Sequence, residues 1–85
     1  MISRAVGVIM KKFITARTYE ETAAAIKKDC INSIFVKVSR CEYRQKFYDV
    51  IADVNGKNYI LNYESFVSIK EANSFLQEII NSLNE

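Results

Sequence analysis

The sequence lacks the residue types on which many catalytic domains depend. It contains no histidine, no tryptophan and no proline, and only two glycines. Without histidine the usual general base near neutral pH is missing, and neither a Ser-His-Asp triad nor a Cys-His pair can form. Gly7 and Gly56 stand alone, so no phosphate-binding glycine motif occurs. We therefore expect no catalytic residues and a protein that is not an enzyme.

Cysteine and long apolar runs are also scarce. Cys30 and Cys41 are too few for a structural zinc site within one chain, so we expect no metal and no cofactor. The apolar run of residues 5–10 is shorter than a signal-peptide core and ends at two lysines. No run approaches the roughly 20 residues that span a bilayer. These absences predict a cytoplasmic protein without membrane contact and with two buried thiols, a disulfide between them being the alternative.

The 85 residues make a single domain, 1–85. A composition of 49% hydrophobic and 26% charged residues excludes a disordered or fibrous chain. Met10-Lys11-Lys12 resembles a second translation start, which makes residues 1–9 a candidate N-terminal extension.

Two segments begin with the spacing of a capping box, a hydroxyl residue followed three positions later by glutamate. Thr18 and Glu21 predict a helix over roughly 19–29, and Ser68 and Glu71 predict one over roughly 69–83. The first helix would carry a narrow apolar stripe of Tyr19, Ala23, Ile26 and Cys30. The second has a broad apolar face, and we expect its Leu76–Ile80 face to pack on a sheet. The residues of the broad face are Ala72, Phe75, Leu76, Ile79, Ile80 and Leu83.

Between these segments the apolar period changes to two, which predicts strands. Asn55-Gly56 favours a type I′ hairpin turn, because both residues readily adopt a positive φ. This turn predicts the pairs Asp53–Asn58, Ala52–Tyr59, Ile51–Ile60, Val50–Leu61 and Tyr48–Tyr63. Asp49 and Asp53 would then face solvent on one side of the hairpin. Any uncovered sheet face would expose Ile51, Ile60 and Phe35 and invite homodimerisation.

An earlier strand is expected from Ile34 to about Arg40, with a turn within Cys41–Gln45 whose register stays open. One attractive register pairs Lys37 with Asp49. The segment from Val6 to Thr15 is a candidate for a further strand. The fold class is therefore α+β: a three-stranded antiparallel meander, or four-stranded if that segment pairs, with two helices packed on it in the order (β)-α-β-β-β-α.

Charge is distributed unevenly along the chain. Residues 1–46 carry ten basic and four acidic residues, a net +6, whereas residues 47–85 carry a net −4. Basic and aromatic residues alternate around the turn of the first hairpin, which is typical of a phosphate-binding surface or of a protein-binding hot spot. The candidate binding residues there are Lys37, Arg40, Tyr43, Arg44 and Lys46. A second candidate surface is an acidic stripe of Glu71, Glu78 and Glu85, spaced seven residues apart.

The stretch from Lys46 to Leu83 resembles the double-stranded RNA-binding domain, with Ser68-Ile69-Lys70-Glu71-Ala72 where that family begins its last helix. That family binds phosphate there through several lysines, whereas this sequence has only Lys70. The same stretch resembles the arm-type DNA-binding domain of phage integrases, in which Asn-Gly-Lys, here residues 55–57, joins two strands. Those strands are basic in that family and acidic here, so no binding residue is transferred from either family.

In size, plan and isoleucine-, lysine- and asparagine-rich composition the chain is also similar to small phage-encoded inhibitors of the anti-CRISPR type. This resemblance implies a small phage or mobile-element protein that binds and inhibits or regulates a host protein. Direct binding of nucleic acid through a basic face within residues 11–46 is the alternative. A homodimer is compatible with either function.

Overall fold

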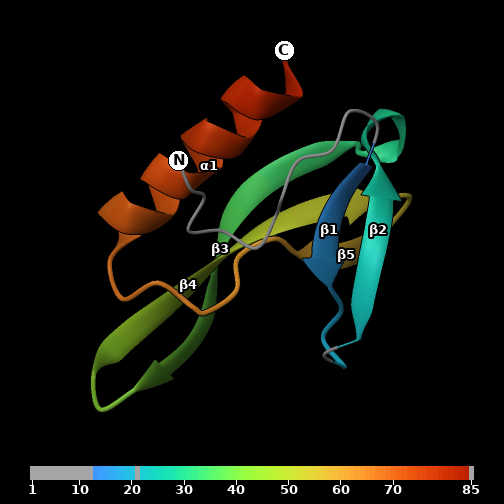
Figure 1. Cartoon of the computed structure of the whole chain (residues 1–85). Coiled ribbons are helices and arrows are strands. Elements are labelled where there is room, and N and C mark those ends of the chain that lie inside the picture. Colours follow the sequence, from blue (N-terminus) through green and yellow to red (C-terminus); the bar gives the residue numbers. More distant parts are fainter. Residues whose placement is uncertain (1–12, 21, 85) are drawn as a thin grey trace.

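The computed structural model describes residues 13–20 and 22–84 of the chain and shows a bent antiparallel sheet with one α-helix across a face of it (Figure 1). The strands lie in the order β2-β1-β5-β4-β3. The elements are β1 (Phe13–Arg17), β2 (Ala23–Lys27), a 3-10 turn η1 (Lys28–Cys30), β3 (Ser33–Glu42), β4 (Gln45–Val54), β5 (Lys57–Ile60) and α1 (Ile69–Leu83). The predicted meander of three or four strands with two helices is therefore wrong, since the sheet has five strands and one α-helix follows it.

The helix expected over residues 19–29 is replaced by β2 and the short turn η1. The Thr18 hydroxyl does accept backbone N–H groups, but from Glu20 and Thr22, each at 3.2 Å. These bonds reverse the chain so that Ala23–Lys27 pairs along the whole of β1. Of the expected apolar stripe, only Ile26 is buried. Pairing with a neighbouring strand thus outweighs a helical preference that rested on a narrow stripe.

The N-terminal strand is displaced from its expected position. β1 begins at Phe13 and shares only residues 13–15 with the candidate strand from Val6 to Thr15. Residues 6–12, and the proposed extension of residues 1–9, lie outside the described residues.

The second hairpin confirms the prediction made from its turn. Asn55 and Gly56 have φ values of 55° and 89°, and the Gly56 N–H donates to the Asp53 carboxylate at 3.1 Å. β4 and β5 pair in the predicted register from Asp53–Asn58 to Ile51–Ile60, and the Leu61 N–H donates to the Val50 carbonyl at 2.9 Å. The predicted Tyr48–Tyr63 pair is wrong, because the chain leaves the sheet after β5 and returns to place Phe66 opposite Tyr48.

The first hairpin is longer than expected, with ten residues in each strand. Lys37 lies opposite Asp49, as in the register suggested from the sequence. A bulge between Val38 and Arg40 shifts the pairing by one residue, so that Cys41 lies opposite Lys46 and Glu42 opposite Gln45.

Helix α1 has the predicted bounds, and the Ser68 hydroxyl caps it by accepting the Glu71 N–H at 3.2 Å. The buried side chains of the helix are Ala72, Phe75 and Ile79, whereas Leu76 and Ile80 are half-buried. The broad apolar face expected from the sequence is therefore the packed one, with Ala72, Phe75 and Ile79 buried most deeply and Leu76 and Leu83 packed against the core. It covers a core that also contains Ile14, Ala16, Ile26, Val50, Ala52 and Leu61.

Three expectations about exposure are also wrong. Ile51 and Ile60 are fully buried and Phe35 is half-buried, so these residues do not form an exposed apolar patch. Cys30 and Cys41 are exposed free thiols rather than buried ones. Asp49, expected in solvent, is buried. Among the described residues, no helix has both the length and the apolar character needed to cross a membrane.

Candidate functional site

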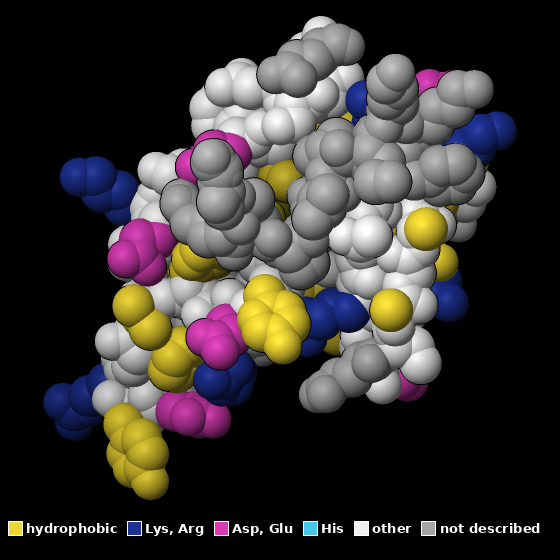
Figure 2. Space-filling model, viewed as in Figure 1, with side chains coloured by type: hydrophobic (Ala, Val, Ile, Leu, Met, Phe, Trp, Pro, Cys, Tyr) yellow, Lys and Arg dark blue, Asp and Glu magenta, His cyan; other side chains and the backbone are white. Residues whose placement is uncertain are grey.

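The end of the β3–β4 hairpin projects from the body of the protein (Figure 1). On the side of β4 away from β3, β5 pairs with Ile51–Val54, and an isolated bridge joins Tyr48 to Phe66. Beyond that bridge, the strand pairs found among the described residues join residues 40–47 to each other. We call residues 40–47 the tip. Basic, acidic and hydrophobic side chains crowd this end of the molecule (Figure 2).

The two residues of the turn, Tyr43 and Arg44, adopt a left-handed backbone conformation. Their φ values are 51° and 65°, the signs that a two-residue type I′ turn requires. Neither residue is one that favours this conformation, which costs a non-glycine residue about 1–2 kcal/mol. The Tyr43 side chain is 100% exposed, so no packing within the described chain offsets this cost. Backbone strain of this kind concentrates at functional sites.

Arg40 is held in place beside the turn by two neighbours. Its Nε atom lies 3.2 Å from Oε2 of Glu42, and its guanidinium carbon lies 4.1 Å from the centre of the Phe47 ring. Gln45 anchors the opposite strand, because its side-chain amide donates to the Val67 carbonyl at 2.8 Å. The tip is therefore preorganised at its base, while Tyr43 and Arg44 extend into solvent.

The five residues singled out from the sequence do not form one basic face. Tyr43, Arg44 and Lys46 lie together at the end of the hairpin, with Arg40 beside them. The sheet pleat and the bulge place Lys46 on the side of α1 and Arg40 on the opposite side. Lys37 lies apart from the tip, with its Nζ atom 5.8 Å from the centre of the Tyr19 ring.

We expect that replacing Tyr43-Arg44 by Asn-Gly stabilises the protein by about 1–2 kcal/mol, because these residues adopt the type I′ conformation without strain. Urea denaturation followed by far-UV circular dichroism measures the change. The reciprocal replacement of Asn55 by Tyr and Gly56 by Arg is the matched control, and it should destabilise the protein by a similar amount. If the Asn-Gly variant were no more stable than the wild type, the turn would not be strained.

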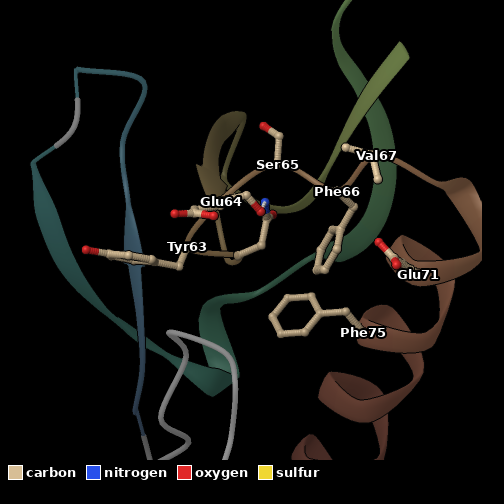
Figure 3. Close-up of a pocket in the computed structure, with 8 residues that line it drawn as sticks. Tyr63, Glu64, Ser65, Phe66, Val67, Glu71 and Phe75 are labelled. Carbon is tan, nitrogen blue, oxygen red and sulfur yellow. Dashed lines mark hydrogen bonds between the residues drawn. The ribbon is translucent and has the colours of Figure 1, made fainter. Parts of the chain in front are cut away.

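A depression of about 280 Å³ lies between residues 62–67 and the first half of α1. Phe66 and Phe75 line it and contact each other, with ring centres 5.4 Å apart. The carboxylates of Glu64 and Glu71 lie on opposite sides of these rings, and Tyr63 points toward the β1–β2 hairpin (Figure 3). Because these polar groups do not converge, the depression has no arrangement suited to general acid–base chemistry or to a metal ion.

A buried polar network that the sequence did not reveal supports the segment after β5. The Asn62 side chain is 1% exposed and makes three hydrogen bonds. Its oxygen accepts the Val50 N–H at 2.7 Å, and its nitrogen donates to Asp49 at 2.9 Å and to the Glu64 carbonyl at 3.0 Å. Ser65 also donates to Asp49, at 2.7 Å. This network is structural, since its groups satisfy one another.

The structure describes two of the three residues of the acidic stripe. Glu71 and Glu78 are exposed on α1, and Glu85 lies outside the described residues. Within residues 13–20 and 22–84, no three His, Cys, Asp or Glu side chains come together as candidate metal ligands.

A scan against protein-family models found no match, and neither did searches of curated proteins and of solved structures. The functional interpretation therefore depends on the geometry of the tip.

Proposed function

We propose that this protein is a non-enzymatic binding module of the cytoplasm that inserts its tip into an acidic, partly apolar cleft of a partner protein and so inhibits or regulates that partner. The observation that carries this proposal is the strained and fully exposed Tyr43 beside Arg44. Tyrosine and arginine are the residues most enriched in protein-binding hot spots, together with tryptophan.

Preorganisation of the tip favours tight binding. Arg40 already contacts Glu42 and Phe47, and these contacts reduce the side-chain freedom that is lost when a partner binds. A narrow two-stranded projection also fits a concave surface.

The distribution of cations favours a protein partner over nucleic acid. Phosphate-binding surfaces track a backbone with a continuous row of cations. Here Lys46 and Arg40 lie on opposite sides of the hairpin, Glu42 offsets the charge of Arg40, and Lys37 is remote. We therefore favour a protein partner, and the test includes a measurement of direct binding to nucleic acid.

The test compares the double variant Tyr43→Ala, Arg44→Ala with the wild type. The matched control is Tyr63→Ala, Lys70→Ala, which removes an exposed tyrosine and an exposed cation outside the tip. The immobilised proteins are exposed to nuclease-treated lysate of the source cells, and the affinity for a stoichiometrically retained protein is then measured. We expect the tip variant to lose about 30-fold or more in affinity, which corresponds to a hot spot of about 2 kcal/mol, and the control to lose little.

A second measurement detects the nucleic-acid alternative. Fluorescence anisotropy with mixed-sequence DNA and RNA is recorded over a range of salt concentrations. Binding whose slope of log K against log salt falls by about one on Arg44→Ala would show a phosphate contact at the tip and contradict the proposed function.

A further inference from the structure

The outer edge of β3 has the main-chain groups needed to add another strand. Among the strands of the described residues, β3 is the last of the sheet and pairs on one side only, with β4. Successive residues of an antiparallel strand direct their main-chain N–H and C=O groups to opposite sides. The Val50 carbonyl accepts the Leu61 N–H on the β5 side, so the alternate residues of β4, beginning on either side of Val50, direct their groups toward β3. Their partners there are Ser33, Phe35 and Lys37. The N–H and C=O groups of Ile34, Val36 and Val38 therefore point away from the sheet.

An apolar strip runs beside this edge, on the face covered by α1. Glu71 and Phe75 line the depression on the far side of β4, so the opposite flank of the helix faces β3. Successive residues of an α-helix are rotated by about 100° around its axis, which places Ile69 and Ile80 on that flank. Ile69 is 52% exposed and Val38 is 46% exposed. α1 begins toward the end from which the hairpin projects (Figure 1), Ile69 is the first residue of α1, and Val38 directly precedes the bulge of β3.

We infer that a second copy of this chain pairs with the β3 edge in antiparallel orientation, with Val36 opposite the second copy's Val36. This register places Ile34 opposite the second copy's Val38, on the same face as α1. On the other face it places Phe35 opposite the second copy's Lys37, a pair that can form a cation–π contact. The two sheets become one ten-stranded sheet, with both helices on the same face and the Ile69 flanks turned toward each other.

The sequence of the edge favours a second copy over an unrelated strand. The segment from Ser33 to Val38 is regular and is followed by the bulge, which ends pairing. Within this segment the register centred on Val36 is self-complementary, since apolar side chains oppose apolar ones and the single charge, Lys37, opposes an aromatic ring. The interface shares no residue with the tip, so the inference and the proposed function can fail separately.

Sedimentation equilibrium of the full chain tests the association. We expect a monomer–dimer equilibrium, and we expect Val38→Lys to weaken it at least about tenfold, because it buries an unpaired ammonium in the dimer. Val67→Lys is the matched control, since Val67 is 53% exposed but lies on the other side of β4. Circular dichroism checks that both variants are folded. A wild-type chain that stays monomeric at about 100 μM, or equal effects of both substitutions, would overturn the inference.

Disulfide trapping tests the register. In a Cys30→Ser, Cys41→Ser background, Val36→Cys places two thiols across the symmetry axis at about 5.5 Å between Cα atoms, within reach of a disulfide. Val38→Cys is the matched control, because its two copies would lie about 13 Å apart along the strands. On mild oxidation we expect covalent dimers of the Val36→Cys variant and none of the Val38→Cys variant. Equal trapping of both variants, or trapping of neither, would overturn the proposed register.

Discussion

Replacing Phe75 by alanine is expected to lower the free energy of unfolding by about 3–5 kcal/mol, the range for deleting a buried aromatic ring. Phe75 is buried where α1 meets the sheet, and its ring contacts that of Phe66. A domain of this size has a stability near the lower end of about 5–15 kcal/mol, so the variant should be largely unfolded near physiological temperature. Urea denaturation followed by far-UV circular dichroism measures the loss.

Two further variants make this prediction specific. Phe75→Leu retains most of the apolar volume and should lose much less stability. Ile80→Ala removes a half-buried side chain on the edge of the packed face and should also cost less than Phe75→Ala. If Ile80→Ala proved as destabilising as Phe75→Ala, Ile80 would lie as deep in the packed face as Phe75, which contradicts the burial observed.

The C-terminal half of the fold was predictable because its signals are local. Asn55-Gly56 specifies one turn type, and that turn specifies the register of the strands on either side. Ser68 and Glu71 begin α1 at the expected position, and the apolar spacing behind them carries the helix to Leu83. In both cases residues a few positions apart determine the structure, and the tertiary contacts agree with them.

The N-terminal half was not predictable because its local signals were ambiguous. A hydroxyl residue at the start of a polar segment can cap a helix or stabilise a tight turn, and Thr18 does the second. Ala23, Ala24 and Ala25 favour a helix on intrinsic preference alone. Their position in β2 depends on pairing with β1, a contact that no spacing within residues 19–29 encodes.

The candidate site was located from its composition but not from its geometry. Alternating cations and aromatics identified the turn around Tyr43 and Arg44, and the structure places these residues at its end. Their positive φ values were not foreseen, because turn-type rules favour Asn and Gly at such positions. The strain is therefore information that the sequence pattern lacks, and it is the feature that most strongly distinguishes this turn from an ordinary solvated one.

The buried polar network was missed for a different reason. Alternation along β4 assigned Asp49 to a solvated face, and it does lie on the face opposite α1. It is buried because the chain leaves the sheet after Ile60 and folds back, bringing Asn62 and Ser65 over it. Periodicity describes residues within strands, so it cannot anticipate a cover supplied by an irregular segment.

Asn62 is expected to be the most sensitive polar residue of the described chain. Asn62→Ala would leave the Val50 N–H and the Asp49 carboxylate without one of their hydrogen bonds. Since each buried polar group left unpaired costs about 1–3 kcal/mol, we expect a total loss of about 3 kcal/mol. Equilibrium denaturation in urea measures this loss, and Asn58→Ala, at a half-buried position in the same hairpin, should change stability by no more than about 0.5 kcal/mol.

The variant Asn62→Asp separates the loss of hydrogen bonds from a simple loss of volume. It keeps the size of the side chain and an oxygen that accepts the Val50 N–H. It replaces the amide nitrogen, which donates to Asp49 at 2.9 Å, by a carboxylate oxygen. Two carboxylates at that distance repel when both are charged, and protonation of one restores a donor between them. The stability of this variant relative to the wild type should therefore be lowest at neutral pH and should recover as the pH falls toward about 4. A difference that stays constant over this pH range would mean that the two side chains are not in contact, and the network would then not be what holds the segment after β5 against the sheet.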